Sequence, residues 1–233
     1  MIKGQQQQKA FEEKIQYTFK DANLLNLALR HSSFTNETRK ELYESNERLE
    51  FFGDAVLDMV VSEYMYREFP QMLEGGLTKL RAAVVCEGSL SRIARKIDLG
   101  DYVLLGKGEE TTGGRTRDSI LADTFEAVVG AIAMDGGVVA AQKFIMEFME
   151  EAIQSTKHTF LDLDCKTHLQ ELMQKTSKIP IQYEIVAENG PDHNKVFVAE
   201  VRHGKKTLGK GEGKSKKEAE QSAAHNALEL LEG

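Results

Sequence analysis

The chain has 233 residues, which is enough for one large domain or for one medium and one small domain. Its hydrophobic content of 41% permits a buried core, and its formal charge of −7 does not by itself suggest a nucleic-acid-binding protein. The two cysteines, Cys86 and Cys165, imply no disulfide framework, and no apolar stretch has the length of a membrane span. With a polar start that is unlike a signal peptide, these features predict a cytoplasmic protein that does not associate with membranes.

The net negative charge is confined to the first part of the chain. Residues 164–233 contain 11 basic and 11 acidic side chains, which leaves 19 basic and 26 acidic side chains for residues 1–163. The whole acidic excess therefore lies in the first part. Such an excess suits metal binding, because a bound cation reverses the local electrostatic field.

The first part of the chain has a helical pattern from about residue 11 to residue 155. Its apolar segments recur with helical spacing, and Pro70, Gly75 and Gly76 interrupt them. The predicted helices cover residues 24–31, 46–61, 77–85, 89–97, 120–134 and 138–156. A glycine-rich loop is predicted for residues 100–114, without the spacing of a phosphate-binding P-loop.

The helix predicted at residues 46–61 carries acidic side chains in an apolar surround. Four carboxylates fall in one narrow sector when successive residues are rotated by about 100°. They are Glu47, Glu50, Asp54 and Asp58. Because a helix that is apolar on most sides is normally buried, we expect a buried helix with a stripe of carboxylates. We expect Asn46 to cap it. The alternative is an ordinary solvated acidic face.

A second helix, predicted after Ser119 as its N-cap, repeats this pattern. Asp123 and Glu126 are three residues apart and share a face among apolar neighbours. Gly130 costs about 1 kcal/mol relative to alanine inside a helix, which indicates close packing against another helix. If the two acidic helices meet, their carboxylates form one site of hard oxygen ligands that suits Mg²⁺ or Mn²⁺. The alternative is two unrelated surface pairs.

Residues 164–233 differ in character from the rest. A helical segment at 165–176 precedes strand-like runs at 181–187, 195–202 and 206–213, and an amphipathic helix with Ser215 as N-cap ends the chain. Strands that lie between two helices without alternating with them predict a small α+β domain. The polar stretch 156–163 is the predicted linker.

Several segments resemble the bacterial ribonuclease III family. In the first part they are NERLEFFGDAVL at 46–57, LTKLRAAVVCEGSL at 77–90, LLGKGEETTGG at 104–114 and SILADTFEAVVGAI at 119–132. In the second part, residues 167–171, 190–193 and 213–220 resemble the double-stranded-RNA-binding domain. The resemblance extends from about residue 16 to the end. It implies an all-α endonuclease domain at 1–155 and an α-β-β-β-α RNA-binding domain at 164–233.

The resemblance implies an endoribonuclease that hydrolyses double-stranded RNA with Mg²⁺, for which Mn²⁺ can substitute, and without an organic cofactor. The expected products carry 5′-phosphates, 3′-hydroxyls and short 3′ overhangs, and ribosomal RNA precursors and other structured transcripts are the expected substrates. The family works as a homodimer, in which Phe51 or Phe52 joins the subunits or else belongs to the core. A non-cleaving regulator that binds double-stranded RNA and a metal-dependent phosphohydrolase for small substrates are the alternatives.

The resemblance also implies roles for individual residues. The catalytic metal ligands implied are Glu50, Asp54, Asp123 and Glu126. The resemblance implies a supporting role for Glu47 and no metal-binding role for Asp58.

The expected RNA contacts lie in three places. The first helix of the second domain faces a minor groove with Thr167, Gln170, Glu171 and Gln174. The loop that enters the next minor groove carries Pro191 and His193. The residues placed near phosphates are Lys214, Ser215, Lys216 and Lys217. For the lysines, the alternative is a solvated surface.

Overall fold

The computed structural model describes residues 2–38, 41, 44–70, 72–177, 179–191 and 195–232. Side chains are described for all of these except residues 2–5, 158–164, 176 and 232. The chain divides after Thr156 into two compact units, Met1–Thr156 and Lys157–Gly233. Among the described residues, no helix combines the length and the apolar character needed to cross a membrane.

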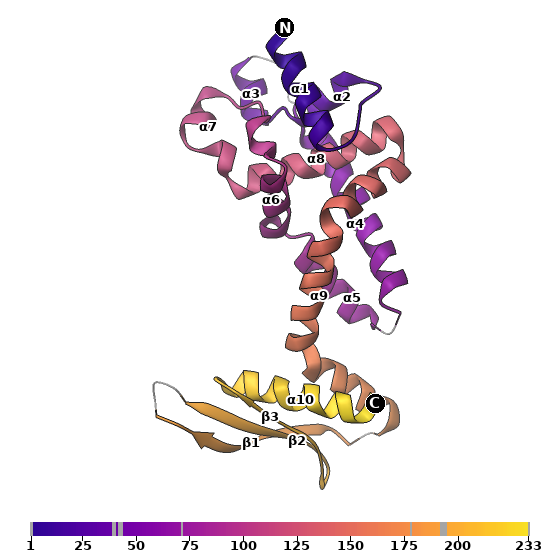
Figure 1. The fold of residues 1–233 in the computed structure, drawn as a ribbon, viewed down its shortest axis with the longest axis vertical. Helices are drawn as coiled ribbons and strands as arrows, with labels where there is room; N and C mark the ends of the chain where they lie inside the picture. The colour runs from indigo at the N-terminus through magenta and orange to yellow at the C-terminus, as the bar shows by residue number, and fades with distance from the viewer. Residues whose placement is uncertain are drawn as a thin grey trace. The chain divides into compact units, whose positions relative to one another are not determined.

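The first unit is built from helices, as the sequence predicts (Figure 1). They are α1 (Ile2–Lys14), α2 (Ala22–Ala28), α3 (Ser32–Glu37), α4 (Glu47–Glu68), α5 (Glu74–Val84), α6 (Glu87–Lys96), α7 (Lys107–Thr111), α8 (Asp118–Gly136) and the first part of α9 (Val138–Thr176). Short 3₁₀ turns occupy Leu99–Asp101 and Gly114–Thr116. The predicted loop at 100–114 therefore contains a short helix, and α9 continues through the predicted linker at 156–163.

Helix α8 forms the centre of the first unit, and α4 crosses it (Figure 1). The crossing depends on two glycines. A Cβ atom on Gly53 would lie 1.8 Å from the carbonyl oxygen of Glu126, and a Cβ atom on Gly130 would lie 2.2 Å from the carbonyl oxygen of Leu49. The two backbones therefore touch where any larger residue would separate them. The close packing that Gly130 predicts is confirmed.

The expectation that α4 is buried on nearly all sides is wrong. Phe51 is 81% exposed, Met59 is 48% exposed and Tyr66 is 75% exposed. Leu49, Val56 and Val60 are buried on the opposite side of the helix. The reason is that α8 covers only one side of α4. The rest of the first unit leaves a second apolar side open to solvent.

Two predicted helix caps also differ from the structure. Asn46 occupies the N-cap position of α4, but its backbone is already helical and its side chain makes no capping hydrogen bond. Helix α8 begins at Asp118, with Arg117 at the N-cap position, so Ser119 lies in the first turn. Asp118 forms an ion pair with Arg95 of α6 instead, which ties the start of α8 to its neighbour.

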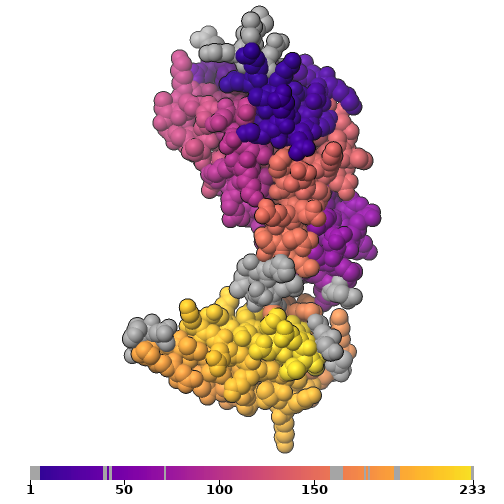
Figure 2. Space-filling model, in the orientation of Figure 1, coloured from indigo at the N-terminus to yellow at the C-terminus, as the bar shows by residue number. Residues whose placement is uncertain are grey.

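The N-terminal segment packs onto the first unit through buried and hydrogen-bonded side chains. Phe11 is fully buried and lies 4.8 Å from the Tyr102 ring, measured between centroids. The carboxylate of Asp135, near the end of α8, accepts hydrogen bonds from the Tyr17 hydroxyl at 2.7 Å and from the Asp21 amide at 2.9 Å. Figure 2 shows this indigo segment as part of one face of the unit.

The second unit is a three-stranded antiparallel sheet with a helix packed on one face (Figure 1). Its strands are β1 (Ile181–Asn189), β2 (Val196–His203) and β3 (Lys206–Gly213), in the spatial order β1-β2-β3, and α10 (Lys216–Glu232) follows. The last part of α9 completes the predicted α-β-β-β-α order. The overall fold class is therefore confirmed.

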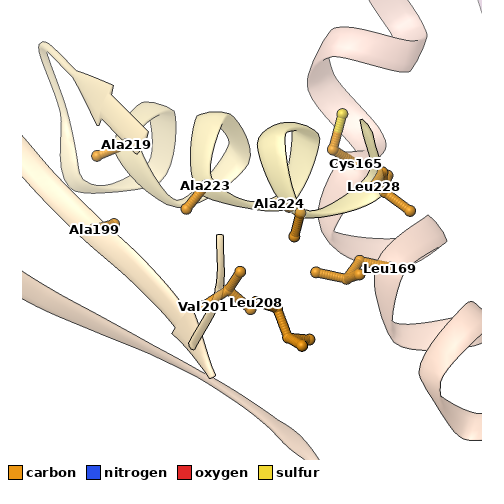
Figure 3. Close-up of a cluster of buried hydrophobic side chains, with 10 residues drawn as sticks. Cys165, Leu169, Ala199, Val201, Leu208, Ala219, Ala223, Ala224 and Leu228 are labelled. Atoms are coloured by element: carbon orange, nitrogen blue, oxygen red, sulfur yellow. The ribbon is translucent and has the colours of Figure 1, made fainter. Parts of the chain in front are cut away.

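Small residues bring α10 against β3. On the strand, Cβ atoms on Gly209, Gly211 and Gly213 would lie 2.1–2.5 Å from backbone atoms of α10. On the helix, the facing residues include Ala219, Ala223 and Ala227, all fully buried. Figure 3 shows how the alanines of α10 meet residues of α9 and the sheet in this core.

The glycine crossing in the first unit can be tested by adding single methyl groups. We expect Gly53→Ala and Gly130→Ala each to lower the free energy of unfolding by about 1–3 kcal/mol or more, because an added methyl group would overlap backbone atoms. Gly88→Ala is the control, since a Cβ atom there meets nothing within 4 Å. It should be neutral or stabilising by up to about 1 kcal/mol. Urea unfolding would measure all three, and equal stabilities would contradict the crossing.

Candidate metal centre and RNA-binding surface

The glycine crossing decides which side chains meet between α4 and α8. Glu50 lies one turn before Gly53 on α4, and Glu126 lies one turn before Gly130 on α8. Asp123 lies a further turn back on α8 and shares the face of Glu126. Backbone contact at the crossing therefore brings carboxylates of the two helices together.

Three carboxylates converge at this point. Glu50, Asp123 and Glu126 are each half-buried, and one oxygen atom from each lies within 4.8 Å of the other two. Among the described residues, this is the one group of three or more His, Cys, Asp or Glu side chains that is close enough to hold a metal ion. The two acidic helices therefore meet as predicted, and these three carboxylates lie together where they meet.

Burial and mutual repulsion raise the pKa values of all three groups. The pKa of Glu126 is raised to about 8, chiefly by burial and then by the charges of Asp54, Asp123 and Glu50. Burial raises the pKa of Asp123, and the charge of Glu87 adds to the effect. The pKa of Glu50 is raised by burial and by its neighbours, foremost Asp123.

Ion pairing within the described residues does not neutralise the cluster. Within the described part of the chain, no lysine or arginine forms an ion pair with Glu50, Asp54, Asp123 or Glu126. Half-buried carboxylates without a counter-charge are unfavourable in the charged form unless they take up a proton or a cation joins them. Hard oxygen donors at this spacing fit a divalent cation such as Mg²⁺.

The other acidic residues of α4 surround this group. Asp54 is exposed, and its oxygen atoms lie outside the group of three, although its charge raises the pKa values of both Glu50 and Glu126. Glu47 is exposed in the first turn of α4. Asp58 is half-buried, with one carboxylate oxygen 3.8 Å from Nε of Arg81 on α5.

The predicted RNA contacts of α9 share one side of that helix. Cys165 and Leu169 are buried in the core of the second unit. Helical spacing places residues 167, 170, 171 and 174 on the opposite side, and Gln170 and Gln174 are exposed.

The remaining predicted contacts follow β1 in the sequence or lie at the start of α10. Pro191 is exposed, and His193 lies outside the described residues. The lysines at 214, 216 and 217 are all exposed. The hydroxyl oxygen of Ser215 accepts a hydrogen bond from the Glu218 amide at 3.2 Å, which confirms Ser215 as the cap of α10.

Some residues near these sites carry no signal in the sequence. Glu87 and His31 influence the pKa of Asp123 from α6 and from the start of α3, which are distant in the chain. Glu188 forms ion pairs with two lysines from separate elements. Only the folded chain brings these groups together, so periodicity could not reveal them.

Each of the two units matches a known protein family. Residues 21–153 match the family model Ribonuclease-III-like, and residues 165–231 match the Double-stranded RNA binding motif. The chain belongs to the ribonuclease III family. The resemblance found in the sequence is confirmed, and membership of this family makes the chain an endoribonuclease.

Relatives in the family match most of the chain. Ribonuclease 3 from Caldanaerobacter subterraneus subsp. tengcongensis is 51% identical over 94% of this chain and 96% of that protein. Ribonuclease 3 from Bacillus cereus is 50% identical over 96% of this chain and 91% of that protein. The solved nuclease domain of ribonuclease III from Campylobacter jejuni is 44% identical, with a TM-score of 0.57, over 61% of this chain and 95% of that one.

The raised pKa of Glu126 predicts a pH-dependent stability in the absence of metal. Folded Glu126 keeps its proton up to about pH 8, whereas a glutamate with the ordinary value of 4.5 releases it earlier. The folded state then binds more protons than the unfolded state between these values, so the free energy of unfolding should fall as pH rises.

Urea unfolding in EDTA from pH 5 to pH 8.5 would measure this dependence. We expect Glu126→Gln to flatten this pH dependence and to stabilise the protein at pH 8. Each unit by which folding raises the pKa of Glu126 corresponds to at most about 1.4 kcal/mol of free energy of unfolding. Adding Mg²⁺ at pH 8 should stabilise the unsubstituted protein more than the variant. Identical pH profiles would contradict the arrangement of charges described here.

Proposed function

We propose that Glu50, Asp123 and Glu126, with Asp54 beside them, form the centre at which this chain hydrolyses double-stranded RNA with Mg²⁺. Mn²⁺ is the expected substitute. The observation that carries the proposal is the group of three half-buried carboxylates with oxygen atoms within 4.8 Å of one another. The expected products have 5′-phosphates and 3′-hydroxyls.

The protein's own contribution is to hold repelling groups in place. Because the backbones of α4 and α8 touch at Gly53 and Gly130, Glu50 and Glu126 cannot move apart without breaking the helix packing. The carboxylates are therefore preorganised for a cation before it binds. When bound, Mg²⁺ supplies a Lewis acid that activates water and stabilises the charge on the phosphate and the leaving oxygen.

The exposed apolar side of α4 supports a homodimer. Phe51, Phe52, Met59 and Tyr66 follow helical spacing along this side, next to the acidic sector, and are 36–81% exposed. Several large apolar side chains exposed along one side of a helix often mark an interface. The structure from Campylobacter jejuni is described as flexible in a region involved in dimer formation. Two sites in a dimer would cut both strands and leave short 3′ overhangs.

The second unit is proposed to hold the RNA duplex. The outer side of α9 faces a minor groove, and the exposed lysines at the start of α10 lie near phosphates. We thus assign catalysis to residues 1–155 and duplex binding to residues 164–233. Ribosomal RNA precursors and other structured transcripts are the proposed substrates, in the cytoplasm. The contact expected from His193 stays a prediction.

Glu126→Gln tests the metal centre. We expect it to abolish cleavage of a long labelled duplex in Mg²⁺, because an amide cannot supply the negative charge that holds the cation. Binding of the duplex should be largely kept. Asp58→Asn is a matched control one turn beyond Asp54 on the same helix, and it should retain cleavage. Full activity of Glu126→Gln would remove Glu126 from the site, and an unsubstituted protein that binds without cleaving would indicate a regulator.

Lys216 and Lys217 test the contact with phosphates. Changing both to alanine should weaken binding to all duplexes similarly, since phosphates carry no base identity. Each lost contact should make the slope of log K against log salt shallower by about 0.9, the value for duplex DNA.

Binding would be measured by a salt titration in Ca²⁺, provided that Ca²⁺ suppresses cleavage. The double substitution of Lys205 and Lys206 is the control, because it removes the same charge at the opposite end of β3. If both double variants match the unsubstituted protein in slope and affinity, the lysines at the start of α10 are only solvated surface.

A further inference from the structure

An acidic residue lies between two lysines at one end of the sheet in the second unit. Glu188 is the penultimate residue of β1. One of its carboxylate oxygens lies 3.2 Å from Nζ of Lys195, just before β2, and the other lies 3.5 Å from Nζ of Lys216, the first residue of α10. One carboxylate thus joins two ammonium groups that are far apart in the sequence.

These lysines flank the parts of the unit that are proposed to contact RNA. Lys195 directly precedes β2, and Lys216 belongs to the basic start of α10. The Lys216 ammonium also lies 5.8 Å from the centroid of the Phe197 ring on β2. Phe197 is directly opposite Glu188 in the register of β1 and β2. The pairing of β1 with β2 therefore holds Glu188 next to Phe197 and close to the Lys216 ammonium.

We propose that Glu188 is an internal competitor of RNA phosphate for Lys195 and Lys216. Its carboxylate holds an anion position shared by the two lysines in the free protein. Duplex binding exchanges this carboxylate for phosphate oxygens. The inference rests on the proposed duplex binding by the second unit and identifies a residue that limits its strength.

RNA phosphate can compete with Glu188 because the ion pair between Glu188 and Lys216 is exposed to solvent. The Lys216 side chain is 62% exposed and that of Glu188 is 39% exposed, so water and ions reach this pair. Ion pairs in such positions contribute little to stability and exchange easily. The negative charge of Glu188 remains after exchange and repels a phosphate bound nearby. The hydrogen bond from Lys195 and the charges of Lys195 and Lys216 lower the pKa of Glu188, as expected for a carboxylate that pairs with both ammonium groups.

Glu188→Gln tests the competition, because glutamine keeps the shape and removes the charge. Duplex binding would be measured by fluorescence anisotropy with the full chain, in a Glu126→Gln background that prevents cleavage, across a range of salt concentrations. We expect binding to become about two- to fivefold tighter, the size expected for an exposed charge pair. The dependence on salt should become steeper.

Glu184→Gln is the matched control. Glu184 lies on the same strand, is exposed and has a carboxylate oxygen 2.9 Å from Arg202, so its substitution makes the same change in net charge. At about 0.15 M salt the Debye length is about 8 Å, which limits long-range effects of net charge. Glu184→Gln should therefore tighten binding less than Glu188→Gln. Equal effects of the two substitutions would overturn a specific role for Glu188.

Lys216→Ala separates failure of the inference from failure of the proposed function. If Lys216 contacts RNA, its removal should weaken binding and should shrink the gain from Glu188→Gln in the double variant. Weaker binding by Lys216→Ala with unchanged or weaker binding by Glu188→Gln would overturn the competition alone. Unchanged binding by Lys216→Ala would instead contradict the proposed phosphate contact. Thermal unfolding of each variant would confirm that the second unit stays folded.

Discussion

The contact between Gly53 and Gly130 is the constraint on which the first unit depends. It brings the backbones of α4 and α8 together. The carboxylates one turn away on each helix are thereby brought close to one another. Their repulsion and burial are unfavourable, as the raised pKa of Glu126 shows. The packing of buried apolar residues along α8 holds the helices in place against this repulsion. A cation at the site relieves an unfavourable arrangement that the fold itself maintains.

The second unit uses small residues in a related way. Glycines on alternate positions of β3 face backbone and alanine atoms of α10, which brings the helix close to the sheet. Because α10 starts directly after β3, this packing fixes the start of the helix beside the end of β1. That position brings Lys216 within reach of Glu188. In both units, residues without bulky side chains determine where the charged ones meet.

Much of this arrangement could be predicted from local features of the sequence. Spacing identified the acidic pairs on two apolar helices, Gly130 indicated close packing, and Ser215 marked the start of α10. Helical periodicity could not show which apolar side of α4 is left uncovered, because Phe51 and Leu49 are equally hydrophobic. The side chain of Asn46 forms no cap, since the backbone at that position is already helical. The ion pairs of Glu188 depend on strand register and on helix placement, neither of which is a local property.

Diffraction from crystals grown with Mn²⁺ tests the metal centre most directly, because anomalous scattering locates the ion without assumptions about activity. The arrangement of α4 and α8 predicts an anomalous peak within coordination distance of oxygen atoms from Glu50, Asp123 and Glu126. Such a peak should be lost in Glu126→Gln crystals grown under the same conditions. Mn²⁺ bound elsewhere, with these three carboxylates free of metal at saturating concentration, would contradict the proposed centre.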